Sequence, residues 1–241
     1  MFITLTCISL RIVRHSDRHS ILSAYTRQRG RMSFLIPAGN GREAARRRAM
    51  LMPGSRFTCV ADIRDNSDRL PTMRDVMPRS PHTLNCDPVK AAVTLFIADF
   101  INTLMRDSMP DGLLFDYCDS MLDFYATSSR GTANFHLMFM IGMMHFAGIE
   151  PDRSTYRPGY IFDMVDGVFR DSAPLHGRFL ERDEATAAAT LMRMTPRNLD
   201  RWKLTAHQRN TILDRLIEYY TLHFTTLQSM RSLDILRSLF H

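Results

Sequence analysis

Two kinds of hydrophobic pattern divide this chain. Up to about residue 82, apolar and polar residues alternate over short runs, which is typical of β-strands. Beyond residue 87 the apolar residues recur every three or four positions, which is typical of amphipathic helices. The change of pattern predicts a strand-rich first part, followed by a helical second part.

Five strand-like runs occupy the first part, separated by Gly, Pro, Asn and Asp. They cover residues 3–12, 20–25, 32–36, 56–63 and 73–77. Inside the first run the apolar positions change phase between Cys7 and Ile8, which predicts a β-bulge. Five short strands favour a five-stranded OB-fold barrel over residues 1–82, although other small barrels share this pattern.

The second part begins with a clear helix start. Asp87 precedes Pro88, and Asp as the N-cap followed by Pro at the first helical position is a common pair. Six helices are predicted, at residues 88–106, 113–125, 132–146, 181–194, 206–224 and 233–240. The third is apolar on most sides, so we expect it to be buried. Residues 205–208 form a capping box at the start of the fifth.

The dipeptide Asp166-Gly167 lies between two short strand-like runs in residues 160–169 and predicts a β-hairpin. The predicted fold class is therefore α+β. Residues 1–82 form the OB-fold, and residues 83–241 form a mainly α-helical domain with a small β-hairpin insert at about 156–180.

Positive charge is concentrated in the strand-rich part. Residues 1–84 hold 15 Arg against 6 Asp and Glu, whereas residues 85–241 hold 16 Lys and Arg against 19 Asp and Glu. The chain also prefers Arg (29) to Lys (2), but that bias does not explain the uneven distribution. A local excess of positive charge is typical of proteins that bind a polyanion, so a nucleic acid or another phosphate ligand is predicted.

Seven arginines form two candidate DNA-binding clusters. Arg27, Arg29 and Arg31 flank the turn at Gly30, and the other four lie in what we expect to be a loop between two strands: Arg42, Arg46, Arg47 and Arg48. Arginine suits this role because it binds phosphates with two hydrogen bonds and also stacks on bases. Three aromatic residues are candidates for base stacking, although positions in the core fit them at least as well: Tyr25, Phe34 and Phe57.

Motifs for common enzyme classes are missing from the sequence. There is no phosphate-binding loop of the G-x-x-x-x-G-K-[ST] type and no G-x-S-x-G nucleophile elbow. The four cysteines are too widely spaced for a zinc site or a disulfide framework, which fits a reducing cytoplasm. Three carboxylate pairs keep a metal-dependent nuclease as the less favoured alternative. They are Asp62 with Asp65, Asp163 with Asp166, and Asp183 with Glu184.

Neither a membrane span nor a signal peptide is expected. The most apolar run, residues 135–149, is too short to span a bilayer and contains two histidines. The apolar N-terminus lacks a preceding positive region and a cleavage site, so a strand is the better interpretation.

Several segments, in a fixed order, resemble the RecO family of bacterial DNA repair and recombination mediators. Residues 30–37 and the Arg-rich stretch after them are similar to the family's first domain. Asp87-Pro88 and six later segments resemble its helical domain: residues 95–100, 133–137, 160–164, 174–177, 191–194 and 232–236. The resemblance covers nearly the whole chain and is to the branch found in Bacteroidetes-type bacteria.

The resemblance implies an OB-fold on a helical domain and a role without enzymatic turnover. Family members bind single- and double-stranded DNA, anneal complementary strands coated with the single-strand-binding protein SSB, and act with RecR to load the recombinase RecA. Their basic OB-domain residues bind DNA, and the nearest counterparts by position are Arg42, Arg46, Arg47 and Arg48, with Arg27, Arg29 and Arg31 close by.

The helical domain should also hold the acidic, Phe-ending tail of SSB in a pocket with one or more arginines. The candidates are Arg106, Arg193, Arg197 and Arg201. A general nucleic-acid-binding module without annealing activity stays open as an alternative. We expect the protein to act in the cytoplasm, at the nucleoid.

One feature departs from the family. Many members carry four zinc-binding cysteines in the insert between the helices, and residues 156–179 of this chain contain none. We therefore expect a protein without a metal or other cofactor, in which Phe162, Val168 and Phe169 hold the hairpin.

Overall fold

The computed structural model describes residues 1–63, 69–79, 87–105, 109–224, 230 and 232–238. Packing divides the chain into two compact units. The first comprises Met1–Thr127 and Met230–Leu239, and the second comprises Ser128–Ser229 and Phe240–His241. This division differs from the predicted change of fold at residues 82 and 83, which falls outside the described residues and stays a prediction.

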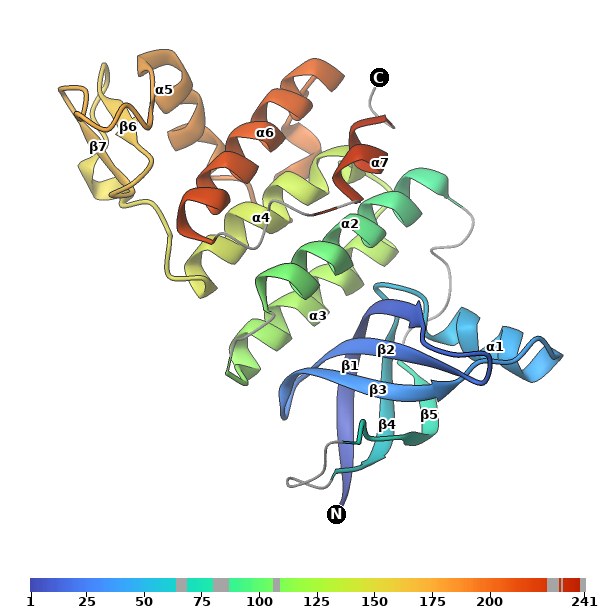
Figure 1. Cartoon of the computed structure of the whole chain (residues 1–241). Coiled ribbons are helices and arrows are strands. Elements are labelled where there is room, and N and C mark those ends of the chain that lie inside the picture. Colours follow the sequence, from blue (N-terminus) through green and yellow to red (C-terminus); the bar gives the residue numbers. More distant parts are fainter. Residues whose placement is uncertain (64–68, 80–86, 106–108, 225–229, 231, 239–241) are drawn as a thin grey trace. The chain divides into compact units, whose positions relative to one another are not determined.

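The first unit contains a five-stranded antiparallel sheet of order β3-β2-β1-β4-β5 (Figure 1). Its strands are β1 (Phe2–Arg14), β2 (His19–Thr26), β3 (Gly30–Pro37), β4 (Arg56–Asp62) and β5 (Met73–Pro78). All five predicted strands are thus confirmed. A bulge in this strand is confirmed as well, but the pairing of β1 with β2 shifts between Ser9 and Arg11, about two residues later than the predicted change of phase.

The sheet curls so that its two outer strands meet at one point. Leu35 of β3 forms a parallel bridge with Thr72, and the Leu35 N–H donates to the Pro71 carbonyl at 2.9 Å. Among the described residues this bridge is the only pairing that joins the two edges of the sheet. The fold is therefore the predicted five-stranded OB-fold, but not a fully closed barrel.

Inward-facing residues of the strands, together with Leu51 of the segment between β3 and β4, form the core of the sheet. This buried cluster contains Leu5, Cys7, Leu22, Ala24, Phe34, Ile36, Leu51, Phe57, Cys59 and Ala61. The thiols of Cys7 and Cys59 are free, with their Sγ atoms 3.9 Å apart. The core thus takes up two of the three aromatics considered for base stacking.

The Arg-rich segment between β3 and β4 is a helix, α1 (Arg42–Met50), so the prediction of a loop there was wrong. Ala, Arg, Glu and Met are all strong helix formers. Glu43 in the first turn and Arg47 and Arg48 in the last turn also suit the helix dipole. No residue of α1 is buried, so the segment lacks the apolar stripe by which a helix is recognised in a sequence.

Three further helices belong to the first unit: α2 (Pro88–Leu104), α3 (Gly112–Thr127) and α7 (Ser232–Ser238). The predicted cap of α2 is confirmed, because Asp87 Oδ1 accepts hydrogen bonds from the N–H groups of Val89 and Lys90 at 2.9 and 3.2 Å. The Ser232 hydroxyl at the start of α7 donates to Asp99 Oδ2 of α2 at 2.7 Å. This bond joins a late segment of the chain to the first long helix.

The second unit is built on α4 (Phe135–Phe146), α5 (Arg182–Leu191) and α6 (Ala206–His223). Short 3-10 turns occupy Thr132–Asn134, Arg153–Thr155 and Leu199–Arg201. Eight of the twelve residues of α4 are buried, as its apolar pattern predicted. The capping box of α6 is confirmed, with Thr205 and Gln208 bonded in both directions. No helix in the described ranges is long and apolar enough to cross a membrane.

The predicted insert is a three-stranded sheet of order β7-β6-β8. Its strands are β6 (Ile161–Asp163), β7 (Val168–Arg170) and β8 (Phe179–Leu180). The turn between β6 and β7 contains Gly167 at φ 68°, a conformation that favours glycine. The Phe162 and Phe169 rings pack with their centroids 4.9 Å apart, so the contact of these two residues is confirmed, and the role of Val168 stays a prediction.

Candidate nucleic-acid interface

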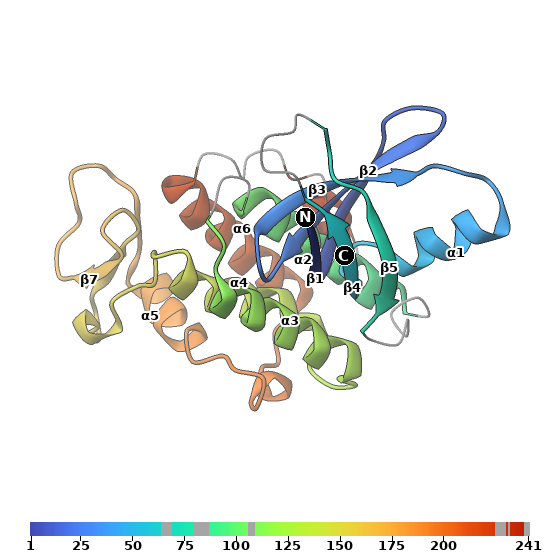
Figure 2. The same ribbon diagram turned by 90° about the horizontal axis from the view of Figure 1, so that it is seen from below.

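Helix α1 presents four arginines on the first unit. It projects from the side of the sheet, light blue in Figures 1 and 2. Arg42, Arg46 and Arg48 are exposed and Arg47 is half-buried. Arg47 Nη2 donates to Glu43 Oε1 at 3.1 Å, and Arg48 donates to the Gly39 carbonyl. Within the described residues, the side chains of Arg42 and Arg46 have no hydrogen-bond or ion-pair partner.

One hollow of about 330 Å³ lies between α1 and β5. Arg46 and Arg47 line it from α1, and Arg74 lines it from β5. Glu43 and Asp75 line the same hollow, so the five side chains carry one net positive charge. A concave site with three guanidinium groups from two elements is suited to a phosphate group, which arginine can bind with two hydrogen bonds.

A second hollow of about 330 Å³ lies between the hairpin that joins β1 to β2, the segment 38–40 that precedes α1, and Arg48 in the last turn of α1. Arg48 and Arg14 line it, together with Asp17, which forms an ion pair with Arg14 at 2.8 Å. Ile36 and Pro37 at the end of β3 line both hollows, so the two lie next to each other. Two neighbouring phosphates of one nucleic-acid strand can therefore be bound beside α1, one in each hollow.

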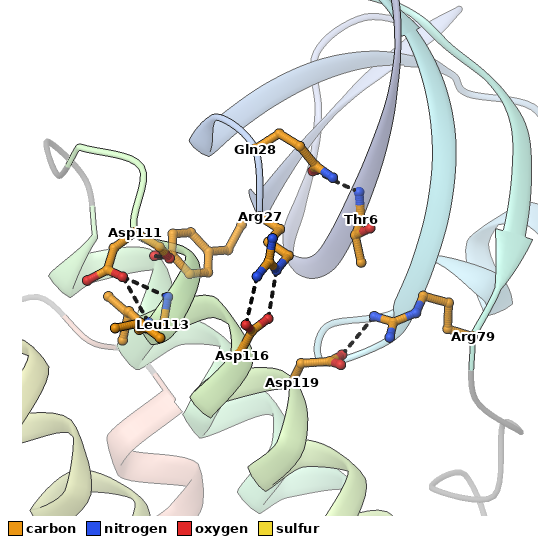
Figure 3. A network of polar contacts seen from close by, with 10 residues as sticks. Thr6, Arg27, Gln28, Arg79, Asp111, Leu113, Asp116 and Asp119 are labelled. Atoms are coloured by element: carbon orange, nitrogen blue, oxygen red, sulfur yellow. Dashed lines mark hydrogen bonds and ion pairs between the residues drawn. The ribbon is translucent and has the colours of Figure 1, made fainter.

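The arginines around the turn at Gly30 have a different environment. Arg27 donates from Nε and Nη2 to the two carboxylate oxygens of Asp116 on α3, at 2.8 and 2.9 Å (Figure 3). The pair lowers the pKa of Asp116 and raises the pKa of Arg27. Next to Arg27, the Gln28 side chain accepts a hydrogen bond from the Thr6 N–H at 3.0 Å. The turn is therefore bonded both to α3 and to β1.

Arg31 and Arg29 also form hydrogen bonds within the protein. Arg31 Nε donates to Asn102 Oδ1 of α2 at 2.9 Å, and the Arg29 N–H donates to Thr26 Oγ1 at 3.1 Å. The Arg29 side chain is exposed. The predicted DNA-binding role of Arg27, Arg29 and Arg31 stays a prediction, but these arginines and those of α1 belong to two separate sets of contacts.

A further arginine of the first part is buried. Arg56, at the start of β4, is 7% exposed and lies 3.7 Å from Asp119 Oδ1 of α3, and it also pairs with Asp123. Arg79 contacts the same Asp119 at 3.1 Å (Figure 3). Part of the positive charge of the first 84 residues thus holds the sheet against an acidic face of α3.

Sequence reasoning missed Arg14 and Arg74 as members of the basic surface. Arg14 ends β1 beside the hairpin, and Arg74 lies on the last strand of the sheet. Neither belongs to a cluster in the sequence, so only the fold brings them next to α1. The aromatic candidates Tyr25, Phe34 and Phe57 are fully buried, as the core interpretation predicted.

Four of the six carboxylates considered for a nuclease have partners within the protein. Asp62 accepts a hydrogen bond from the Met1 ammonium at 3.3 Å, and Asp65 lies outside the described residues. Asp163 and Asp166 both pair with Arg170, and Glu184 pairs with Arg215. In the described part of the chain, no group of three His, Cys, Asp or Glu side chains is arranged to hold a metal ion.

Comparison with known proteins agrees with the fold. Models of the N-terminal and C-terminal parts of Recombination protein O match residues 1–81 and 86–231. The chain is 32% identical to the DNA repair protein RecO of Phocaeicola vulgatus over 97% of both chains, and 31% identical to that of Bacteroides fragilis over 97% of both. It is 29% identical to that of Porphyromonas gingivalis over the full length of both. The chain therefore belongs to the RecO family of DNA repair proteins.

Proposed function

We propose that this protein is a recombination mediator that binds single- and double-stranded DNA and anneals complementary strands coated with SSB. With RecR it promotes the loading of RecA. It acts without enzymatic turnover, in the bacterial cytoplasm at the nucleoid. One observation carries the proposal: three of the four arginines of α1, Arg46, Arg47 and Arg48, border two adjacent hollows, whose other walls supply Arg14 and Arg74.

The physical argument concerns what annealing requires. Two strands repel each other through their phosphates, so a protein that brings them together must neutralise phosphates while leaving the base edges free to pair. Guanidinium groups on an exposed helix meet this requirement, since they bind the backbone irrespective of sequence. No residue needs to react. Arg27, Arg29 and Arg31 remain secondary candidates, because Arg27 and Arg31 already have partners within the protein.

The test replaces Arg42, Arg46, Arg47 and Arg48 together by Ala. Alanine is the best helix former, so α1 should persist. The log–log salt dependence of single-strand binding has a slope of about −0.7 per phosphate contacted, and the variant should lose about two to three units of slope. It should also anneal SSB-coated complementary oligonucleotides poorly.

A matched control removes the same charge from exposed sites on the second unit. In this control Arg182, Arg193, Arg197 and Arg201 are replaced by Ala. The control should keep the slope and the affinity of the parent. If both variants bind as the parent does, α1 is not the DNA site. Binding without annealing would favour the general nucleic-acid-binding module, and cleavage of labelled DNA with magnesium or manganese would favour the nuclease.

We also propose that the tail of SSB binds the second unit, at a pocket next to α5 and α6. The pocket has a volume of about 150 Å³ and an almost wholly apolar lining that includes Phe162, Leu180, Leu191 and Tyr219. An apolar cavity of about 150 Å³ is large enough to bind benzene, so a phenylalanine ring fits. Arg215 lines the same pocket and can pair with the acidic end of the tail.

Arg215 is a different residue from those predicted for this role. Arg106 lies outside the described residues, and Arg193, Arg197 and Arg201 do not line this pocket. Arg215 now pairs with Glu184 at 2.8 Å and Glu218 at 3.0 Å, so the tail would have to displace these carboxylates. A labelled tail peptide should bind the parent and an Arg201→Glu control, but not Arg215→Glu. Absence of binding to the parent would contradict the proposal.

A further inference from the structure

An exposed aromatic side chain lies on the outer face of the OB sheet. Phe2, at the start of β1, is 58% exposed. A single exposed apolar side chain is common on a protein surface, so the importance of Phe2 depends on its neighbours. Its exposure contrasts with the full burial of Tyr25, Phe34 and Phe57.

Arg74 joins Phe2 to the basic surface. Its guanidinium carbon lies 3.9 Å from the centroid of the Phe2 ring, in a cation–π contact. The same side chain lines the hollow that contains Arg46 and Arg47. One guanidinium group therefore borders both the aromatic ring and the candidate phosphate site.

An irregularity in β5 accompanies this arrangement. The pairing of β4 with β5 shifts between Thr58 and Val60, and Asp75 has a φ of 53°. Asp tolerates this left-handed conformation better than most residues. Bulges of this kind change the direction of a neighbouring side chain, and Arg74 directly precedes Asp75.

We propose that Phe2 and Arg74 form a base-stacking platform for single-stranded nucleic acid, adjoining the phosphate site of α1. An unpaired base can stack on an exposed aromatic ring or a guanidinium plane, whereas the bases of a duplex are already stacked inside it. Arg74 keeps the platform next to the backbone bound at Arg46 and Arg47. The platform therefore gives the surface a preference for single strands. This inference rests on the proposed DNA site at α1.

The affinity test uses two variants at Phe2. Phe2→Ala removes the ring, and Phe2→Leu keeps an apolar side chain without a π face. Both should bind single-stranded oligonucleotides about fivefold or more weakly, the loss expected when one stacked base is released. Both should keep the salt slope and the duplex affinity of the parent, because no phosphate contact is removed.

A fluorescence test reports the stacking directly. The chain has one tryptophan, Trp202, so Trp202→Phe gives a background in which Phe2→Trp is the only reporter. Single-stranded DNA should quench this tryptophan in parallel with the anisotropy change of an end-labelled oligonucleotide. A matched control places the reporter at the fully exposed Leu175 of the second unit, where binding should leave the fluorescence unchanged.

The outcomes separate this inference from the proposed function. If the Phe2 variants bind single strands as the parent does and Phe2→Trp is not quenched, while the α1 variant loses its slope, the platform is wrong and the DNA site stands. If the α1 variant also binds normally, the proposed function fails first. Quenching of the Leu175→Trp control to the same extent would also overturn the platform.

Discussion

Arg27 and Asp116 are 89 residues apart in the sequence and are joined by two parallel hydrogen bonds, Nε to Oδ1 at 2.8 Å and Nη2 to Oδ2 at 2.9 Å (Figure 3). This fork-to-fork geometry is the one in which arginine binds a carboxylate most strongly. It also uses the donors with which Arg27 would bind a phosphate. The arginine-rich first part thus contains a set of arginines that bind the protein's own carboxylates.

We predict that Arg27→Ala leaves DNA binding almost unchanged. The affinity and the salt slope for single strands should match those of the parent, because the lost donors face Asp116. The melting temperature should fall slightly, and Asp116→Ala should lower it by a similar amount, since both side chains are about half exposed. In a double variant the melting temperature should fall by less than the sum of the two single decreases, because both substitutions remove the same ion pair. A lower salt slope for Arg27→Ala would instead place Arg27 on the DNA.

A second prediction concerns the buried cation Arg56. Its removal leaves Asp119, which is 17% exposed, without its buried partner. Removing one partner of a buried ion pair lowers the free energy of unfolding by about 3 to 5 kcal/mol. We expect the lower end of this range, about 3 kcal/mol, for Arg56→Ala, because its second partner Asp123 is partly exposed. Urea unfolding measures this loss.

Arg79→Ala is the control for Arg56, because Arg79 contacts the same Asp119 from a side chain that is 37% exposed. Its removal should cost less than about 1 kcal/mol. Equal effects of the two substitutions would show that burial does not set the strength of this network.

Local signals in the sequence predicted most of the elements. The alternation in β1 and the Asp87 cap depend only on residues that are close in the sequence, so both can be recognised without knowing the fold. The existence of a bulge in β1 was predicted from a phase shift between Cys7 and Ile8, although the bulge itself lies between Ser9 and Arg11. Helix α1 was missed because it is polar on all sides, and periodicity of apolar residues is the signal that identifies a helix.

The site could be predicted only in part. Three of its arginines, Arg46, Arg47 and Arg48, are adjacent in the sequence, but Arg14 and Arg74 join them through the packing of the sheet. The outward position of Phe2 could be predicted from the alternation in β1, because Phe2 lies two residues from the outward-facing Thr4 and three from the buried Leu5. The ion pair of Arg27 offered none, since a contact across 89 residues leaves no local pattern.

A third prediction is acid sensitivity from His136. Burial, together with the charge of Arg209, lowers the pKa of His136 from 6.5 to about 3. The unfolded chain takes up a proton near pH 6.5 and the folded chain does not until near pH 3, so acid favours unfolding between these values. This stability is fully present above pH 6.5 and falls by up to about 1.4 kcal/mol for each pH unit below it.

His136→Gln should remove this dependence. Between pH 7 and pH 5 the free energy of unfolding of the parent should decrease more steeply than that of the variant. Phe139→Leu, a substitution in the same buried helix that does not titrate, should give a curve parallel to that of the parent. Parallel curves for the parent and His136→Gln would show that His136 does not carry the effect.

The last prediction concerns the insert that many family members build around zinc. Here the fully buried Asp163 of β6 is the common partner of several groups. Its Oδ1 accepts hydrogen bonds from the N–H groups of Val165 and Asp166 at 2.9 and 3.1 Å. Arg170 of β7 lies 3.2 Å from Oδ2, at ion-pair distance.

His176, from the loop before β8, completes this cluster. Its Nε2 lies 3.2 Å from Asp163 Oδ1, and its Nδ1 accepts a hydrogen bond from the Arg178 N–H at 3.0 Å. A neutral imidazole with its proton on Nε2 satisfies both contacts. Asp163 therefore connects β6, β7 and the approach to β8, the segments that a metal ion would otherwise hold together.

Asp163→Ala should loosen the insert, at a local cost of about 2 to 4 kcal/mol, because Arg170 and two backbone N–H groups lose their buried acceptor. Hydrogen exchange and limited proteolysis in residues 156–180 measure this change. Asp166→Ala is the control, because Asp166 pairs with the same Arg170 at 2.7 Å but is 57% exposed, so the effect should be small. Treatment of the parent with EDTA should leave its melting temperature unchanged. Stoichiometric zinc in the purified protein, or a melting temperature that falls with EDTA, would contradict an insert held by this carboxylate.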